Sequence, residues 1–328
     1  MEPLLLITIF ASFFCTFLLL PFWIKRAKSE GLVGKDMHKN DKREVAEAGG
    51  VIVLLGFSVG ILLYIAINTF YFENNLLLTS MFAILCVLLI SSMLGAVDDL
   101  LGWKRGLSKK LRIAMMFFAA IPLMAINAGE SVVIGIDFGI IYPLVLIPLG
   151  IIGASTTFNF LAGYNGLETS QGILILSALT LVTFLDGSPW LSMVCLFMVA
   201  SLFAFYIFNK NPAQIFPGDT LTYPVGALIA VIAILGNIEK IAIFFFIPYL
   251  LEMFLKLRGS LKKESFAKLN KDGSLEMPYD KIYGLEHLAI KILKSIKFSK
   301  KAYEWEVVFL INIFQLFIIF LGFVLFPI

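Results

Sequence analysis

The sequence contains little charge, little cysteine and almost no histidine. Charged side chains make up 15% of its 328 residues, well below the roughly 25% found in soluble globular domains. The three cysteines, Cys15, Cys86 and Cys195, lie in apolar runs and have the spacing of neither a metal site nor a disulfide framework. Because His38 and His287 are the only histidines, a histidine-rich transition-metal site is not expected. Any bound metal should therefore take oxygen ligands.

Apolar residues, by contrast, are abundant. They make up 59% of the chain, with 32 phenylalanines among them, and the mean hydropathy is +0.92. Since a membrane span needs about 20 mostly apolar residues, the sequence predicts an all-α polytopic membrane protein with ten transmembrane helices. The predicted spans are 4–24, 49–71, 76–97, 111–127, 143–161, 171–185, 190–208, 221–236, 240–257 and 306–327. Positive charges follow the first span and do not precede it, which favours a start outside over a cleaved signal peptide.

Lysine and arginine are distributed unevenly between the predicted loops. If the chain starts outside, the cytoplasmic loops hold 25 of the 26 basic residues, and only Lys240 lies on the other side. These loops are 25–48, 98–112, 162–170, 208–220 and 256–305. Because cytoplasmic loops collect Lys and Arg, both termini are predicted to lie outside. The net charge of +3 is explained by this topology and does not indicate a nucleic-acid partner.

The loops carry two further structural signals. Outside, alternation around Gly135 and Asp137 predicts a small β-hairpin. Inside, apolar residues recur at helical spacing between Leu285 and Ile296 among several lysines. This pattern predicts an amphipathic helix that either lies on the anionic leaflet or packs on its own domain. With no internal repeat, residues 1–328 are expected to form one integral membrane domain with a cytoplasmic loop insertion at about 258–305.

Polar residues interrupt the apolar sequence mainly at the predicted cytoplasmic ends of the spans. They are Asp98, Asp99, Asn159, Asn165, Glu168 and Asp219, and the cations Lys104, Arg105, Lys109, Lys110 and Arg112 belong to the same face. Carboxylate and amide oxygens suit Mg²⁺, which takes its other ligands from water and substrate phosphates. Cations beside them suit a phosphorylated substrate. The set therefore predicts phosphoryl transfer, whose catalysis is mostly positioning and charge neutralisation.

Each of these residues also has a purely structural interpretation. Asp98 and Asp99 lie about 100° apart on a helix, so one can face a substrate while the other contacts a metal or a lysine. The pair can also be a solvated helix end. Likewise, Asp219 in Gly-Asp-Thr suits a helix N-cap, and Asn159 and Asn165 suit an interrupted helix end. Their joint placement at one membrane face favours the functional interpretation.

Three motifs carry a resemblance to a known family. GAVDDLLGWKRGLSKKLR, FNFLAGYNGLE and FPGDT occur in this order, and the chain resembles the polyprenyl-phosphate N-acetylhexosamine-1-phosphate transferases of glycosyltransferase family 4. AGYNGLE is similar to the AGxNGLE of the archaeal and eukaryotic branch that makes dolichyl-diphosphate N-acetylglucosamine. The likeness extends through GKDMHKNDKREVAEAGG and KKESFAKLNKDGSLEMPYDK, and so covers most of the chain.

The resemblance implies a metal site and a pair of catalytic acids. Asp219 and Asn159 occupy the positions of the family's Mg²⁺ ligands, for which Mn²⁺ is the alternative metal. Asp98 and Asp99 match paired aspartates that contact the lipid phosphate or assist its deprotonation. Direct attack by the lipid phosphate and a covalent intermediate at an aspartate both stay open.

The resemblance also implies Lys110 as a third catalytic residue, together with residues that bind the substrates. Lys110 falls near the family's phosphate-binding lysine, with Lys109 as a contender for the same role. Asn165 and Phe216 match positions associated with hydrogen bonding to uracil and stacking on it, and Glu47 belongs to the early loop near the nucleotide sugar.

The chain departs from the family pattern in two places. Thr156 stands where relatives usually have asparagine. Lys262, Lys263, Glu264 and Ser265 stand where eukaryotic enzymes carry an arginine and histidine cluster over the sugar diphosphate. Lys263 is therefore the candidate cation for that role, and the identity of the sugar is open. Glu168, the last residue of AGYNGLE, completes the predicted substrate-binding set.

The implied function is transfer of a sugar-1-phosphate, N-acetylglucosamine-1-phosphate by the resemblance, from a UDP-sugar to a polyprenyl or dolichyl phosphate. The reaction releases UMP and starts lipid-linked oligosaccharide assembly for N-glycosylation. The expected location is the cell membrane, with the active site on the cytoplasmic face, and the chain can act as a monomer or a homodimer. A secondary transporter for an anionic or phosphorylated solute is the alternative, because interrupted helices and intramembrane acids also characterise transporters.

Overall fold

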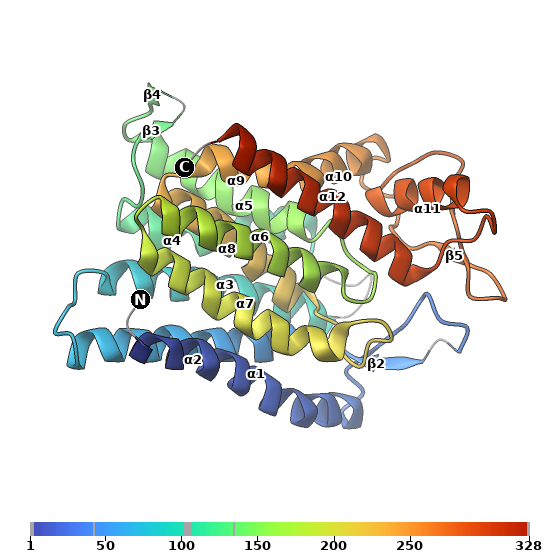
Figure 1. The fold of residues 1–328 in the computed structure, drawn as a ribbon, viewed down its shortest axis with the longest axis horizontal. Coiled ribbons are helices and arrows are strands. Elements are labelled where there is room, and N and C mark those ends of the chain that lie inside the picture. The colour runs from blue at the N-terminus through green and yellow to red at the C-terminus, as the bar shows by residue number, and fades with distance from the viewer. Residues whose placement is uncertain (1–2, 42, 102–106, 134, 327–328) are drawn as a thin grey trace.

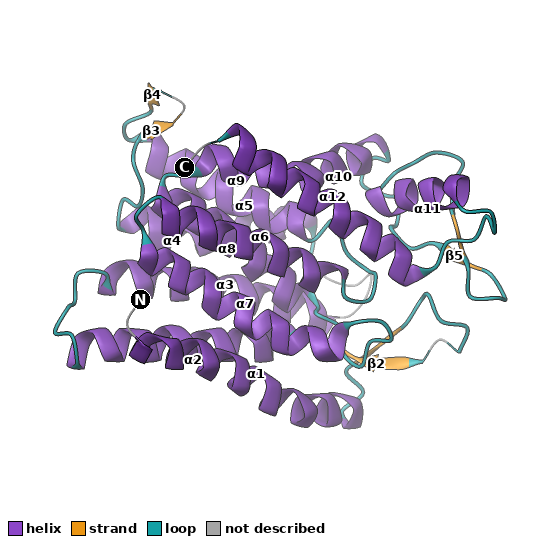
Figure 2. Ribbon diagram, viewed as in Figure 1, coloured by secondary structure: helices purple, strands orange, loops and turns teal. Residues whose placement is uncertain are grey.

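The protein is a bundle of helices with three short two-stranded sheets. A computed structural model describes residues 3–41, 43–101, 107–133 and 135–326. In the described part of the chain, helices form the body of the molecule and strands occur only in the connecting segments (Figure 2). This confirms the predicted helical membrane fold in its coarse outline.

The helices follow the apolar stretches of the sequence. Their bounds are α1 Pro3–Ser29, α2 Gly50–Phe70, α3 Leu78–Leu101, α4 Lys109–Ala125, α5 Ile147–Phe158, α6 Leu167–Leu185, α7 Pro189–Asn209, α8 Asp219–Gly236, α9 Glu239–Phe245, α10 Ile247–Arg258, α11 Leu285–Ile296 and α12 Glu304–Leu325. A π-helical turn, Tyr142–Leu146, leads into α5. The antiparallel strand pairs are β1 Val33–Lys35 with β2 Glu44–Ala46, β3 Val132–Val133 with β4 Ile136–Asp137, and β5 Lys268–Leu269 with β6 Leu275–Glu276.

Seven of the described helices are long and apolar enough to cross a membrane. They are α1, α2, α3, α6, α7, α8 and α12. The other predicted spans correspond to shorter helices, and the stretch 240–257 is divided between α9 and α10. Pro248 lies in the first turn of α10, where its missing N–H costs nothing and its fixed φ favours a new helix start. The structure therefore supports a multi-pass membrane protein.

Helix α8 lies at the centre of the bundle. Within its most apolar window 89% of the residues are buried, against 22% for α1. A helix that is apolar all round is surrounded either by other helices or by lipid, and α8 is enclosed by helices. It packs closely on α3, since a Cβ added at Gly95 would collide with the backbone of Asp219. The first residues of α8 are consequently held in the middle of one end of the bundle.

The two ends of the bundle differ in what they carry. Both chain termini and the hairpin β3–β4 lie at one end, and β1–β2, β5–β6 and α11 lie at the other (Figure 1). Helix α11 buries Leu285, Ala289 and Ile290 against the rest of the chain, as in packing on its own domain. Ile296 and Phe298 remain exposed.

Candidate active site

Two cavities lie at the end of the bundle that carries β1–β2, and they meet at Asn159 and Asp219. The first cavity, of about 520 Å³, is lined by residues 31–37, Glu47, parts of 159–168 and 216–219. The second cavity, of about 530 Å³, is lined by the start of α4, the end of α5, Tyr223 and parts of 256–266. Asn159, Ala162, Gly163, Asp219 and Phe266 line both, so molecules bound in the two cavities would meet along this shared wall, whose polar side chains are Asn159 and Asp219.

Asp99 caps the first turn of α8. Its carboxylate accepts hydrogen bonds from the backbone N–H groups of Asp219, at 2.8 Å, and Thr220, at 3.1 Å. Gly218, with φ of +70°, turns the chain into the helix, and a Cβ there would collide with Asp99. A carboxylate at a helix N-terminus satisfies free N–H groups and the positive end of the dipole. Asp99 therefore holds Asp219 in place from another helix.

Replacing Asp99 with alanine is expected to lower the stability of the protein. The variant leaves two N–H groups of α8 without their acceptor, which costs about 1–2 kcal/mol by analogy with N-cap removal. Thermal unfolding in detergent should show a lower midpoint for Asp99→Ala. The control is Asp186→Ala, because Asp186 is an exposed aspartate at the far end of α6. Equal midpoints for the two variants would contradict the capping role.

Asp98 is buried behind the wall of the second cavity and forms an ion pair with a residue of that wall. Its side chain is buried, and its Oδ2 lies 2.6 Å from Nε of Arg112. The Tyr223 hydroxyl donates to the same oxygen at 3.4 Å, and the backbone N–H of Leu107 donates to Oδ1 at 2.7 Å. Arg112 and Tyr223 line the second cavity. The adjacent aspartates thus face different partners, as their separation of about 100° on a helix requires.

The two residues predicted to hold a metal, Asn159 and Asp219, line the same two cavities. The Thr222 hydroxyl donates to Oδ1 of Asn159 at 3.0 Å, and Thr222 lies one turn after Asp219 on α8. An amide oxygen has two lone pairs, so Asn159 retains one for a cation. The described residues contain no group of three or more His, Cys, Asp or Glu that could hold a metal. The set fits Mg²⁺ shared with substrate phosphates better than an all-protein cage.

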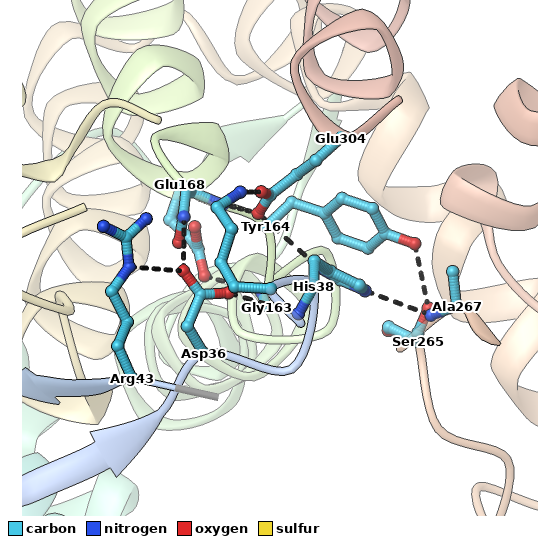
Figure 3. A network of polar contacts seen from close by, with 11 residues as sticks. Asp36, His38, Arg43, Gly163, Tyr164, Glu168, Ser265, Ala267 and Glu304 are labelled. Atoms are coloured by element: carbon cyan, nitrogen blue, oxygen red, sulfur yellow. Dashed lines mark hydrogen bonds and ion pairs between the residues drawn. The ribbon is translucent and has the colours of Figure 1, made fainter. Parts of the chain in front are cut away.

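Asn165 takes part in a network that joins four parts of the chain, and Figure 3 shows Asp36, Glu168 and Glu304 among its members. Its backbone N–H donates to Oε1 of Glu304 at 2.9 Å, and its Nδ2 donates to Oδ2 of Asp36 at 3.0 Å. Glu168 is buried and accepts from the backbone N–H of Gly163 at 2.7 Å, so it braces the same loop. Asn165, Glu168 and Asp36 all line the first cavity.

His38 connects this network to the long loop after α10. Its Nε2 accepts from the backbone N–H of Ala267 at 3.2 Å, and its Nδ1 lies 3.5 Å from Oε1 of Glu304. The imidazole ring packs on Tyr164, with ring centroids 4.3 Å apart. Lys39 also pairs with Glu304. These buried contacts hold the early loop against the loop that carries Asn165.

Phe216 and Glu47 form another wall of the first cavity. The backbone N–H of Phe216 donates to the carbonyl of Ala46 at 2.7 Å, which extends the β1–β2 pair by one more segment. The Glu47 carboxylate lies against Gly34, where a Cβ would collide with it. Burial raises the pKa of Glu47, and the nearby Asp99 carboxylate raises it further.

The predicted lysines are placed differently from one another. Lys263 lines the second cavity, and its Nζ lies 4.6 Å from the centroid of the Tyr279 ring. Lys110 is exposed in the first turn of α4 and lines neither cavity. The side chain of Lys109 lies outside the described part of the structure, as do Lys104 and Arg105.

Several residues of the site did not stand out in the sequence. They are Asp36, Glu304, Thr222, Tyr223 and Lys256, while Arg112 was recognised only as one cation among several. Thr222 and Tyr223 follow Asp219 within one helical turn, and Lys256 is a lysine within an apolar helix, buried and bound to Ser265. Proximity to Asp219 along the helix is the signal that could have identified Thr222 and Tyr223 from the sequence.

Comparisons of the sequence with known proteins find similarity to transferases. The family description "Glycosyl transferase family 4" matches residues 81–237. A Saccharolobus solfataricus protein, named "Putative UDP-N-acetylglucosamine–dolichyl-phosphate N-acetylglucosaminephosphotransferase", is 34% identical over 88% of each chain. A Dictyostelium discoideum UDP-N-acetylglucosamine–dolichyl-phosphate N-acetylglucosaminephosphotransferase is 27% identical over 74% of this chain and 69% of that protein. A Streptococcus thermophilus phospho-N-acetylmuramoyl-pentapeptide-transferase is 29% identical over 74% and 75% of the two chains.

Proposed function

The chain belongs to glycosyl transferase family 4, and on that basis we propose that it transfers N-acetylglucosamine-1-phosphate from UDP-N-acetylglucosamine to dolichyl phosphate, releasing UMP. The observation that carries the proposal is the meeting of two cavities at Asn159 and Asp219. A reaction between a nucleotide sugar and a lipid phosphate needs two adjoining compartments. It also needs positioning groups where the phosphates meet.

The first cavity would take the UDP-sugar. Phe216 would stack on the uracil ring, Asn165 would hydrogen-bond its edge, and Glu47 and Glu168 complete the lining. Asp219 and Asn159 would hold a Mg²⁺, or Mn²⁺, whose charge neutralises diphosphate oxygens when it is bound. In this arrangement the uridine end is anchored away from the junction, and the phosphorus that bears the sugar lies closest to the second cavity.

The second cavity would take the lipid phosphate. Arg112, held by Asp98, supplies a fixed guanidinium at its wall, and a guanidinium suits phosphate oxygens well. An oxygen of the lipid phosphate attacks the phosphorus that bears the sugar. The bond from that phosphorus to the UMP oxygen breaks as the new P–O bond forms, and UMP leaves. Lys263, at the cavity wall, would bind the diphosphate from the other side.

The proposed topology has ten spans, with both termini outside and the active site on the cytoplasmic face of the cell membrane. Two observations support it. Both termini lie at the end of the bundle opposite the cavities (Figure 1), and 25 of the 26 Lys and Arg residues belong to the loops assigned to the cytoplasm. UDP-sugars are charged and water-soluble, so a cytoplasmic site would have direct access to them.

Phe216→Leu is expected to weaken donor binding more than turnover. Base stacking on an aromatic side chain contributes about 1–3 kcal/mol, so the KM for UDP-N-acetylglucosamine should rise on the order of 10-fold, with kcat nearly unchanged. Steady-state kinetics at saturating dolichyl phosphate measure both. Phe22→Leu on the exposed face of α1 is the control. A fall in kcat without a change in KM would contradict the stacking role.

The proposed function is tested by UMP release from the purified protein in detergent. The reaction contains dolichyl phosphate and UDP-N-acetylglucosamine, with and without Mg²⁺. We expect Mg²⁺-dependent UMP and an equal amount of lipid-linked sugar. Turnover only with a different UDP-sugar would keep the reaction and change the donor. No turnover with any donor, together with uptake of a phosphorylated solute into proteoliposomes, would replace the transferase by a transporter.

A further inference from the structure

Asp36 is a buried carboxylate beside the side chain of Asn165. It is 2% exposed and Asn165 is 6% exposed, and both line the first cavity. Oδ2 of Asp36 accepts a hydrogen bond from Nδ2 of Asn165 at 3.0 Å. The two residues are 129 positions apart in the sequence, so the fold brings them together.

This contact fixes which way the Asn165 amide faces. An Asn side chain has a donor half and an acceptor half of nearly the same shape, and a rotation by 180° exchanges them. An ionised carboxylate only accepts hydrogen bonds, so the NH₂ half must face Asp36. Within the described part of the chain, no other contact uses the second N–H or Oδ1 of Asn165. These two groups are available to a ligand in the first cavity.

The surrounding contacts hold both partners in place. Oδ1 of Asp36 accepts from the backbone N–H of His38 at 3.2 Å, and Nε of Arg43 lies 3.9 Å from Oδ2. The backbone of Asn165 is fixed separately by Glu304. Figure 3 shows the Asp36 carboxylate with its contact to Arg43. The Asp36 carboxylate and the Asn165 backbone are therefore each anchored independently of the contact between the two side chains.

Amide orientation matters because uracil and cytosine differ by the same exchange of donor and acceptor. Uracil presents an N3–H donor beside the O4 acceptor, whereas cytosine presents an N3 acceptor beside the N4 amino donor. An Asn amide that is free to flip can pair with either base. An amide held in one orientation offers its acceptor and its donor in fixed positions and can match only one of them.

We propose that Asp36 is a specificity-determining positioning residue that locks the Asn165 amide in the orientation that accepts uracil and rejects cytosine. The inference rests on the proposed function, since it concerns the base of the nucleotide donor. Asp36 does not touch the base or the reacting atoms in this assignment. It acts through Asn165 alone, by excluding the flipped amide.

The test compares inhibition of UDP-N-acetylglucosamine turnover by UMP and by CMP. The test variant is Asp36→Asn, whose amide can either accept from Asn165 or donate to it and so permits the flip. The wild type should prefer UMP by roughly 5- to 150-fold, the discrimination of one bidentate base contact. In Asp36→Asn the ratio of the two inhibition constants should fall at least about 5-fold. Asp41→Asn, an exposed aspartate of the same loop, should retain the wild-type ratio.

Two outcomes would overturn the inference. One is an unchanged ratio in an Asp36→Asn variant that still turns over UDP-N-acetylglucosamine. The other is equal inhibition of the wild type by UMP and CMP, a result that does not depend on whether the variant folds. A failure of the proposed function looks different, because the wild type would then release no UMP at all. A merely structural role of Asp36 would lower activity without changing the UMP to CMP ratio.

Discussion

Replacing Asp219 with asparagine is expected to reduce UMP release by at least about 100-fold. Removal of a residue that only orients a metal ligand typically costs about 10- to 100-fold, and Asp219 is assigned as a ligand itself. It lies where both cavities meet, at the first residue of the most enclosed helix. Asparagine keeps the shape but loses the charge that attracts a divalent cation. The Mg²⁺ concentration for half-maximal turnover should therefore rise as well.

The Asp219→Asn variant should remain folded, which makes its activity interpretable. The hydrogen bond to Asp99 comes from the backbone N–H of Asp219, so the substitution leaves this cap intact. The thermal midpoint in detergent should stay close to that of the wild type and of Asp186→Asn. A stable variant with nearly normal activity and an unchanged Mg²⁺ requirement would show that Asp219 is not a metal ligand.

The sequence predicts the large features of this fold because they depend on local composition. Apolar stretches of about 20 residues become helices in a membrane protein whatever their neighbours are, so every predicted span corresponds to helix in the structure. The convergence of Asp98, Asn159, Asn165 and Asp219 also follows from topology, since alternate helix ends meet at one face. The separate directions of Asp98 and Asp99 follow from helix geometry alone.

The partners of these residues could not be predicted, because they depend on packing between distant segments. Lys109 and Lys110 stand close to Arg112 in the sequence, but the packing of α3 on α4 gives Arg112 to Asp98 and leaves Lys110 exposed. Likewise, the contact of Asp36 with Asn165 spans 129 residues. Periodicity and motifs contain no information on such pairs. Only the geometry of the folded bundle decides between chemically equivalent candidates.

The pair of Arg112 and Asp98 gives the second large effect. Arg112→Met is expected to reduce turnover at low dolichyl phosphate by about 100- to 1,000-fold, the usual loss when one preorganised group facing transition-state charge is removed. Methionine keeps much of the apolar stem and removes the guanidinium. The variant also leaves the Asp98 carboxylate, 2% exposed, without its cation. Since Arg112 itself is 37% exposed, solvent should limit that cost to about 1–3 kcal/mol of stability.

The double variant Asp98→Asn with Arg112→Met separates two roles for Asp98. If the aspartate mainly holds Arg112, then removing its charge when the arginine is already gone should cost no further activity. It should also restore part of the stability lost in Arg112→Met, because the unpaired buried carboxylate is no longer present. If Asp98 instead contacts the lipid phosphate or takes its proton, the double variant should lose activity beyond Arg112→Met. Thermal midpoints and kcat/KM for dolichyl phosphate across the four proteins of this cycle decide between them.

The geometry favours the holding role for Asp98. Its Oδ2 contacts Arg112 and Tyr223, and its Oδ1 accepts from the backbone N–H of Leu107. Arg112 and Tyr223 line the second cavity, whereas Asp98 is not part of that lining.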